Sequence, residues 1–355
     1  DVVVVGERIA EIVRPRSRSA AHSIDASSCW VVPGFVDLHV HGGGGADFSD
    51  GTASAAQAVL GFHAAHGTTR VVASLVPAEL DRLRRTIGIL STSRLPGLLG
   101  VHLEGPYVSP TKRGALASAH LRMPDRDEFG RLVAGSGDTV RIVTLAPELP
   151  GAADLLAAIR DVGAIPAIGH YEATYEQALA AIEGGARHVT HWGNAMSGLH
   201  HRAPGVAGAA LFDPRVTIEL IADGSHVHPS VIRFLVEDLA AREQLRRLSL
   251  VSDAIRAAGT PDGPSTVGDL DVAVRGGVAS LPDGTLSGST LTLDVALRNV
   301  MDYTGIPLAE AVCLVTRNPA SVLGEDSVGE LRPGAYADAV LLDAELNVRM
   351  TIRSG

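Results

Sequence analysis

The chain has 355 residues, of which 46% are hydrophobic, and its formal net charge is −10. This length suits one large domain with a small addition, and the apolar content is sufficient to fill a buried core. The basic residues are spread along the chain, so the sequence predicts no binding to nucleic acid or to an anionic membrane surface. The partner that we expect is a small soluble molecule.

Cysteine usage and hydropathy also bear on the compartment. Cys29 and Cys313 are the only two cysteines and lie far apart, which predicts ordinary thiols rather than a disulfide framework. No apolar run reaches the roughly 20 residues that span a bilayer. No basic segment precedes an apolar run as it does in a secretory signal. We therefore expect a cytoplasmic protein.

At the N-terminus, two short β-branched runs flank a glycine. They cover residues 2–5 and 7–13 and predict a β-hairpin. This hairpin precedes the pattern that dominates the rest of the chain.

From residue 33 onward, short apolar runs alternate with amphipathic helical stretches, which is typical of βαβ units around a parallel sheet. Eight apolar runs predict an α/β fold, a closed (β/α)8 TIM barrel, over residues 33–324. The runs are residues 35–40, 70–75, 100–103, 140–145, 165–168, 188–190, 217–221 and 248–251. Helices are expected at residues 55–66, 80–90, 152–162, 175–184, 230–241, 291–303 and 307–314, and a hairpin insertion at residues 270–286.

The C-terminus is again β-rich, at residues 339–342 and 346–352. Because the termini of a domain commonly lie close together, these segments can pair with the N-terminal hairpin. We predict a small β-sandwich domain that combines residues 1–32 and 325–355.

Polar residues follow the apolar runs at several points. In a parallel barrel the C-terminal ends of the strands meet at one mouth and supply the catalytic groups. Each residue alone is more often a hydrogen-bonded polar group at a strand end, but the set together favours a divalent metal site, because imidazole and carboxylate suit Zn²⁺, Fe²⁺ or similar ions. The candidates are His39, His41, Glu104, His170, His191 and Asp253.

His39 and His41 are two residues apart on an extended segment. Side chains at this spacing point to the same side of a strand, so both can reach one ion. A histidine pair of this kind is weak evidence for a metal site on its own. The other four candidate ligands strengthen that interpretation.

Several segments resemble a known family. PGFVDLHVHG at residues 33–42 is similar to the opening barrel strand of the amidohydrolase superfamily, and VSDA at residues 251–254 to its closing strand. Segments that resemble N-acetylglucosamine-6-phosphate deacetylases are HLEGP (102–106), LAPE (145–148), THWGNAM (190–196), HHRAPG (200–205), IADGSHV (221–227) and GTLSGS (284–289). These segments run in order across nearly the whole chain.

The resemblance implies a metal centre. Glu104, His170 and His191 would bind the principal ion. His39 and His41, with no lysine placed to form a bridging carbamate in the fourth strand, suggest a second site that shares Glu104. We expect one or two divalent ions per chain.

The resemblance also implies roles around the substrate. Asp253 would move the proton between the attacking water and the leaving amine, and His226 would polarise the carbonyl. Asn194, Ala195 and Arg202 match the segment that binds the phosphate of the sugar, where a basic residue can reach across the interface of a homodimer. The sequence departs from the family at Leu116, where many relatives carry a polar residue.

The function that we expect is hydrolysis of the N-acetyl group of N-acetylglucosamine 6-phosphate to glucosamine 6-phosphate and acetate. Two alternatives stay open. One is another amidohydrolase, such as a deaminase or a cyclic amidase, and the other is a non-catalytic barrel that serves as a scaffold.

Overall fold

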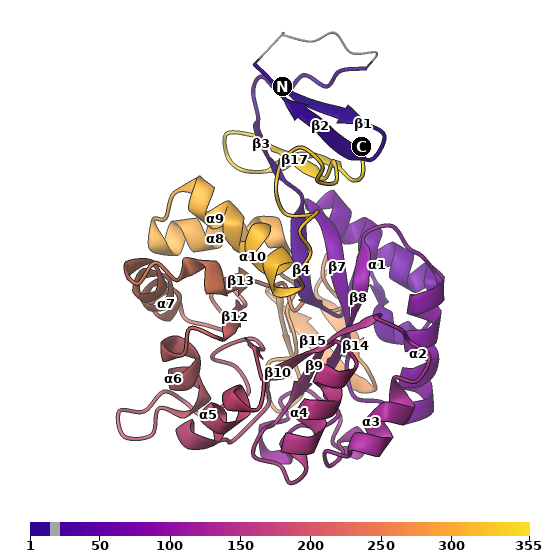
Figure 1. Cartoon of the computed structure of the whole chain (residues 1–355), viewed down its shortest axis with the longest axis vertical. Helices are drawn as coiled ribbons and strands as arrows, with labels where there is room; N and C mark the ends of the chain where they lie inside the picture. Colours follow the sequence, from indigo (N-terminus) through magenta and orange to yellow (C-terminus); the bar gives the residue numbers. More distant parts are fainter. Residues whose placement is uncertain (15–21) are drawn as a thin grey trace.

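The computed structural model describes residues 1–14 and 22–355. An eight-stranded parallel sheet lies inside a layer of helices, and small antiparallel sheets from both chain ends lie together at the top of Figure 1. The predicted fold class, a (β/α)8 barrel with a small β-sandwich built from both termini, is confirmed. Within the described ranges, no helix is long and apolar enough to cross a membrane.

The barrel strands follow one another around the sheet in chain order. They are β4 (Phe35–Val40), β7 (Thr68–Leu75), β8 (Leu98–Glu104), β9 (Val140–Leu145), β10 (Ile165–Ile168), β11 (His188–Val189), β12 (Thr217–Leu220) and β13 (Leu248–Leu250). All eight predicted strands are present. Every residue of β4 and β7 is buried, as expected where helices cover the outer face of a parallel sheet.

The two ends of this sheet meet beyond the regular strands. The Asp253 N–H donates to the His39 carbonyl at 2.8 Å, and the His41 N–H donates to the Ala254 carbonyl at 2.8 Å. These bonds join the segment after β13 to β4. They also bring Asp253 beside the two histidines of the first strand.

Ten α-helices occur in the described residues: α1 (Ala53–Ala65), α2 (Leu80–Thr92), α3 (Arg126–Leu132), α4 (Ala152–Asp161), α5 (Tyr175–Glu183), α6 (Gly205–Phe212), α7 (Pro229–Ala241), α8 (Leu293–Thr304), α9 (Leu308–Leu314) and α10 (Arg317–Val322). The seven predicted helices are present, each within two residues at both ends. The sequence missed α3, α6 and α10. Nearly all of α6 is buried and apolar, so it lacks the polar face that gives a helical period. The other two are short.

Shorter elements occupy the connections. They are β5 (Gly42–Gly43), β6 (Ala46–Asp47) and the 3₁₀ helices η1 (Phe48–Asp50), η2 (Pro110–Lys112), η3 (Ser118–His120) and η4 (Leu245–Arg247).

The chain ends form two small sheets. The N-terminal hairpin pairs β1 (Val2–Val5) with β2 (Arg8–Ile12), and the second sheet has the order β18 (Val348–Ile352), β17 (Ala339–Leu342), β3 (Trp30–Pro33). The Ile9 N–H donates to the Ala335 carbonyl at 2.9 Å, which ties the two ends together. The division of the chain at residues 32/33 and 324/325 stays a prediction.

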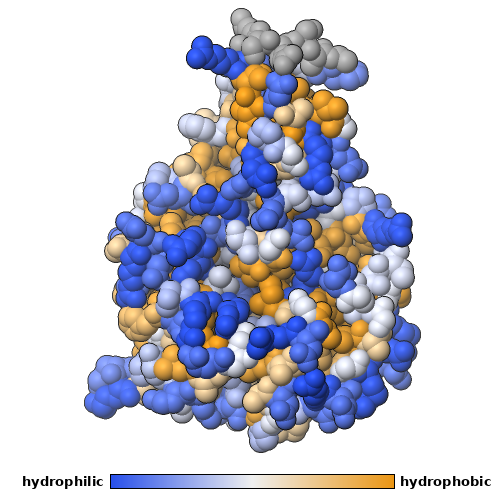
Figure 2. Space-filling model, in the orientation of Figure 1, coloured by the Kyte–Doolittle hydropathy of each residue, from blue (hydrophilic) through white to orange (hydrophobic). Residues whose placement is uncertain are grey.

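Apolar surface gathers over these small sheets in Figure 2. Exposed apolar side chains of the two sheets are Val4, Val5, Ile12, Trp30, Val31 and Met350.

A buried ion pair connects the barrel to the C-terminal sheet. Arg70 of β7 donates from Nε to Asp338 Oδ2 at 2.6 Å and from Nη2 to Asp338 Oδ1 at 3.2 Å. The guanidinium also lies 4.4 Å from the centre of the Tyr336 ring. A two-point contact of this kind fixes orientation as well as distance, so it holds the small sheet against the N-terminal end of β7.

The insertion differs from the predicted hairpin. It is a three-stranded antiparallel sheet of β14 (Gly263–Val267), β15 (Leu270–Arg275) and β16 (Val278–Ser280), and β14 was missed. β14 was not predicted because Pro264 is unfavourable inside a strand. An edge strand nevertheless tolerates proline, because half of its N–H groups face away from the sheet. Val267 and Val272 of this sheet pack with Leu116 and Ile255, so the insertion covers part of the barrel mouth.

Helix α1 fixes the glycine loop that follows His41. His63 of α1 donates from Nε2 to the Gly42 carbonyl at 3.0 Å. A Cβ on Gly43 would lie 2.4 Å from the Phe62 ring, so only glycine allows the loop to approach the helix this closely. The opposite nitrogen of His63, Nδ1, is buried and has no partner.

The surroundings of His63 predict a pH-dependent stability. Burial lowers the pKa of His63 to about 4, because a proton on Nδ1 would leave a donor without an acceptor. The unfolded chain binds that proton more readily than the folded one, so the contribution of His63 to stability is intact above pH 6.5 and is lost as the pH falls toward 4. The full loss is about 3 kcal/mol.

Chemical denaturation of the wild type and of His63→Gln between pH 7 and pH 4 measures this effect. Glutamine keeps an amide donor for Gly42 and does not titrate. As the pH falls, the unfolding free energy of the wild type should therefore decrease more than that of His63→Gln. A difference between the two proteins that stays constant over this range would show that His63 does not stay neutral in the fold.

Candidate active site

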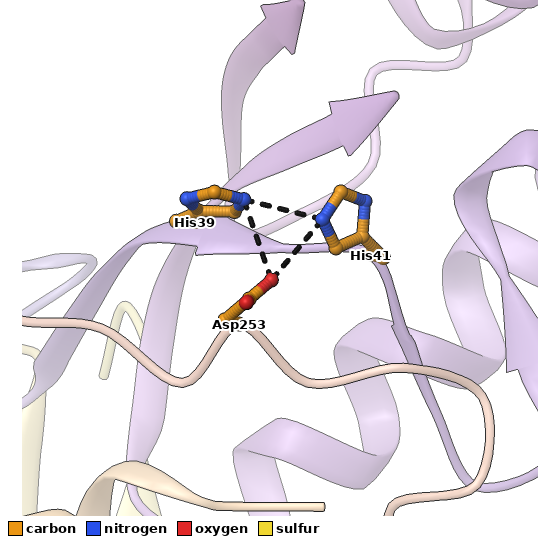
Figure 3. A group of neighbouring side chains, drawn as sticks. All are labelled: His39, His41 and Asp253. Atoms are coloured by element: carbon orange, nitrogen blue, oxygen red, sulfur yellow. Dashed lines mark hydrogen bonds and ion pairs between the residues drawn. The ribbon is translucent and has the colours of Figure 1, made fainter. Parts of the chain in front are cut away.

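Two groups of candidate metal ligands lie at the mouth of the barrel. The first contains His39 and His41 at the end of β4 and Asp253 after β13, with their rings and carboxylate directed at one another in Figure 3. The two histidine Nε2 atoms are 3.1 Å apart. The Asp253 Oδ1 atom lies 3.4 Å from Nε2 of His39 and 3.2 Å from Nε2 of His41.

The second group contains Glu104 at the end of β8, His170 after β10 and His191 after β11. The Glu104 Oε1 atom is 3.0 Å from Nε2 of His170 and 3.0 Å from Nε2 of His191. All three side chains are buried. In each group the ligand atoms lie within 4.8 Å of one another.

Glu104 lies between the two groups. Its Oε1 atom faces the second group and is also 3.5 Å from His39 Nε2, while its Oε2 atom is 3.4 Å from His41 Nε2. The structure thus brings together all six candidate ligands from five strand ends, with one carboxylate shared between them.

The backbone of this site is strained at four positions. His170, His191, Ala195 and Asp253 have φ angles of 53°, 31°, 47° and 48°. Residues other than glycine rarely adopt these backbone angles. Such strain concentrates at functional sites, where the surrounding structure enforces it. At His170, His191 and Asp253 the turn occurs directly beyond a strand, where it directs the side chain toward the barrel axis.

Further hydrogen bonds orient the histidine rings. His170 Nδ1 lies 2.9 Å from the Lys112 carbonyl, and His39 Nδ1 lies 3.0 Å from Glu219 Oε2. Each ring therefore presents Nε2 to the centre of the site. Glu219 was not among the predicted site residues, although an acidic residue inside the apolar run at residues 217–221 is a usable signal.

The charges of the site favour a bound cation. Burial alone would lower the pKa of His39, but the carboxylates of Asp253 and Glu104 outweigh it and raise that pKa to about 9. Burial likewise opposes ionisation of Glu104, and the nearby histidines hold its pKa well below the ordinary value. The carboxylates thus stay ionised and need positive charge beside them, which protons supply here and a divalent ion supplies with better geometry.

An open cavity of about 300 Å³ lies above the two groups. Its polar lining includes Asn194 and His226, and Ala195 also lines it. The remaining lining residues include Val76, Gly114, Ala115, Leu116, Ile255, Val267, Thr285, Leu286 and Gly288. A small polar molecule can therefore meet the candidate ligands and an apolar wall at the same time.

Asp223 holds His226 in place at this cavity. The Asp223 Oδ2 atom accepts from His226 Nδ1 at 2.6 Å, and Asp223 Oδ1 accepts the His226 N–H at 2.8 Å. Burial opposes a charged ring, but the bond to Asp223 raises the pKa of His226 above its ordinary value. Since Nδ1 is engaged, Nε2 is the nitrogen that can meet a substrate.

Two predicted site residues, Arg202 and the fully buried His39, are not among the residues that line the cavity. Arg202 is exposed on the loop before α6, where its Nη1 lies 2.7 Å from His201 Nε2. Leu116, in contrast, lines the cavity and is buried, so this departure from the family pattern lies at the site itself.

The chain is similar to known proteins over most of its length. The profile of the Amidohydrolase family matches residues 30–355. The N-acetylglucosamine-6-phosphate deacetylase of Vibrio furnissii is 35% identical over 358 residues, which cover 99% of this chain and 88% of that protein. The N-acetylgalactosamine-6-phosphate deacetylase of Escherichia coli O157:H7 is 38% identical over 323 residues, or 89% of this chain and 84% of that protein.

A solved structure gives the same relationship. A mutant of N-acetyl-D-glucosamine-6-phosphate deacetylase from Mycobacterium smegmatis, in complex with N-acetyl-D-glucosamine-6-phosphate, matches with a TM-score of 0.93 and 38% identity, covering 100% of this chain and 93% of that chain. The resemblance found in the sequence segments is confirmed. The chain belongs to the N-acetylglucosamine-6-phosphate deacetylase family of the amidohydrolases.

Proposed function

We propose that the chain hydrolyses the acetamide of N-acetylglucosamine 6-phosphate and releases acetate and glucosamine 6-phosphate. The observation that carries the proposal is the shared Glu104 between two buried ligand groups on the floor of a cavity that Asn194 and His226 also line. The substrate follows from the relatives that act on this sugar phosphate.

The six candidate ligands fit two divalent ions per chain, such as Zn²⁺ or Fe²⁺, one in each group. When bound, such an ion lowers the pKa of a water molecule and polarises the amide carbonyl. Glu104, His170 and His191 would hold one ion. His39, His41 and Asp253 would hold the other, with Glu104 between them.

Asp253 is the group that we assign to proton transfer. Burial opposes its ionisation, but His39 and His41 lower its pKa below the ordinary value, so it is a carboxylate at neutral pH. It can accept the proton of the attacking water and then deliver it to the nitrogen of the leaving amine. The open cavity beside it gives the substrate access to this carboxylate.

His226 is the group that we assign to the carbonyl oxygen. Its Nδ1 donates to Asp223, and the raised pKa of the ring favours a proton on Nε2. A donor fixed in this way can stabilise the negative charge that develops on the oxygen as the amide is attacked.

The phosphate would meet donors at the rim of the cavity. The side chain of Asn194 and the backbone at Ala195 line the cavity, whereas Arg202 lies outside it. We propose that Arg202 serves the cavity of a second copy in a homodimer. Exposed Leu199 on this loop and exposed Phe212 at the end of α6 supply apolar surface for such contact. Sedimentation equilibrium tests this arrangement, and a monomer at high concentration would rule it out.

A phosphorylated substrate and the free thiols of Cys29 and Cys313 suit a cytosolic enzyme, which stays a prediction. The scaffold alternative is disfavoured because all six ligand positions are occupied by competent side chains. N-acetylgalactosamine 6-phosphate is the second candidate substrate, because a deacetylase of that sugar phosphate is 38% identical to this chain.

Acetate release by protein loaded with zinc or iron tests the proposed function. N-Acetylglucosamine 6-phosphate should give the highest kcat/KM in a panel with N-acetylgalactosamine 6-phosphate, unphosphorylated N-acetylglucosamine, cytosine and dihydrouracil. Equal rates with unphosphorylated N-acetylglucosamine would show that the enzyme does not recognise the phosphate group. Turnover of only the cyclic substrates would assign the chain to another amidohydrolase activity.

Replacing Asp253 with Asn separates proton transfer from the architecture of the site. Asparagine keeps an oxygen that can face the ion but cannot accept the proton, so kcat should fall by about 10²- to 10⁴-fold while KM changes little. The same substitution at Asp271, an exposed residue of β15, is the matched control and should keep wild-type kinetics. A kcat for Asp253→Asn within about threefold of the wild type would move the proton transfer to another group, with His226 examined next.

A further inference from the structure

Glu219 is a completely buried carboxylate on β12 that lies below the candidate metal ligands. We propose that Glu219 is a positioning residue that fixes the tautomer of His39 and thereby sets the affinity of the His39–His41–Asp253 group for a divalent cation. The proposal rests on the metal centre of the proposed function.

One oxygen of Glu219 serves both ligand groups. Its Oε2 atom lies 3.0 Å from His39 Nδ1 and accepts the backbone N–H of His191 at 3.1 Å. His39 belongs to the first group and His191 to the second. A single carboxylate oxygen therefore contacts one member of each group, by a side chain in one case and by the backbone in the other.

The other oxygen of Glu219 is held from the opposite direction. Its Oε1 atom lies 2.8 Å from His188 Nε2, and His188 Nδ1 lies 2.6 Å from Thr217 Oγ1. His188 is also fully buried. This second contact prevents the carboxylate from rotating away from His39, so the position of Oε2 is defined by neighbours on both sides.

The contact with Glu219 decides which nitrogen of His39 is available. A carboxylate can only accept, so His39 Nδ1 must carry a hydrogen, and Nε2 is the nitrogen whose lone pair can go to a metal ion. This Nε2 atom faces His41 and Asp253, the other members of its group. Negative charge behind an imidazole also makes its free nitrogen a stronger ligand, and loss of such a partner typically lowers metal affinity about 10- to 100-fold.

The second contact of Oε2 acts on geometry. His191 has a φ of 31°, an angle that its neighbours must enforce. The bond from its N–H to Glu219 is one such restraint. In Glu219→Gln the side-chain carbonyl can still accept this N–H, whereas the negative charge behind His39 is lost. The substitution should therefore weaken the first group and largely spare the second.

Cobalt titration followed by visible absorption, with a chelator competing for the ion, measures each affinity. The wild type should bind two Co²⁺ per chain. Glu219→Gln should lower the affinity of one site by about 10- to 100-fold and leave the other within about threefold. In a His41→Asn background, which disables the first group, the same substitution should change the remaining affinity by less than about threefold.

Ser249→Ala is the matched control. Ser249 lies directly opposite Glu219 on β13, is fully buried, and its hydroxyl has no hydrogen-bond partner, so its loss alters the same level of the barrel without touching His39. This variant should bind both ions as the wild type does. Equal affinities in Glu219→Gln and the wild type, or a parallel loss at both sites together with a fall in Tm, would overturn the proposal.

A measurement on the wild type keeps the proposal testable if Glu219→Gln fails to fold. In zinc-loaded protein with ¹⁵N-labelled histidine, NMR should show His39 protonated at Nδ1, and a hydrogen on Nε2 would overturn the proposal. Metal binding and tautomer are both read without substrate. If two ions bind as described but N-acetylglucosamine 6-phosphate is not hydrolysed, the proposed function fails and the role of Glu219 stands.

Discussion

The carboxylate of Glu104 is the contact on which the rest of the candidate active site depends. It is buried among four histidine rings, and burial would neutralise an isolated carboxyl group. The rings of His39, His41, His170 and His191 keep it ionised, and in return its two oxygens hold the two ligand groups together. Such a concentration of buried charge is costly to assemble, and a divalent ion on either side of Glu104 would compensate it.

The barrel supplies the rigidity that this arrangement needs. Its strands are buried on both faces and follow one another in chain order, so their C-terminal ends form a fixed ring. Left-handed turns then redirect His170, His191 and Asp253 toward the centre of that ring. Glu219 and Asp223 orient His39 and His226 from behind. The substrate cavity is completed by the inserted sheet, whose apolar residues pack with Leu116 and Ile255.

Much of this arrangement follows from the sequence because the C-terminal ends of all strands in a parallel barrel meet at one mouth. Residues that are far apart in the sequence but lie at strand ends therefore come close together. Polar residues after apolar runs located His39, Glu104 and Asp253 at one mouth without knowledge of any distance. Glu219 was not found, because a glutamate inside an apolar strand does not reveal which ring it faces until the register of β12 against β11 is known. Helix α6 was not predicted because its uniformly apolar composition gives no helical period, and β14 was not predicted because it contains a proline. The proposed role of Arg202 in the cavity of a second copy does not follow from the sequence of one chain.

The positions of bound metal ions test the central claim most directly. Anomalous diffraction at the zinc absorption edge, from crystals of the zinc-loaded protein, locates each ion independently of activity. The account predicts two peaks that flank the Glu104 carboxylate, one against His39, His41 and Asp253 and the other against His170 and His191. A single peak, or peaks that do not contact Glu104, would contradict it.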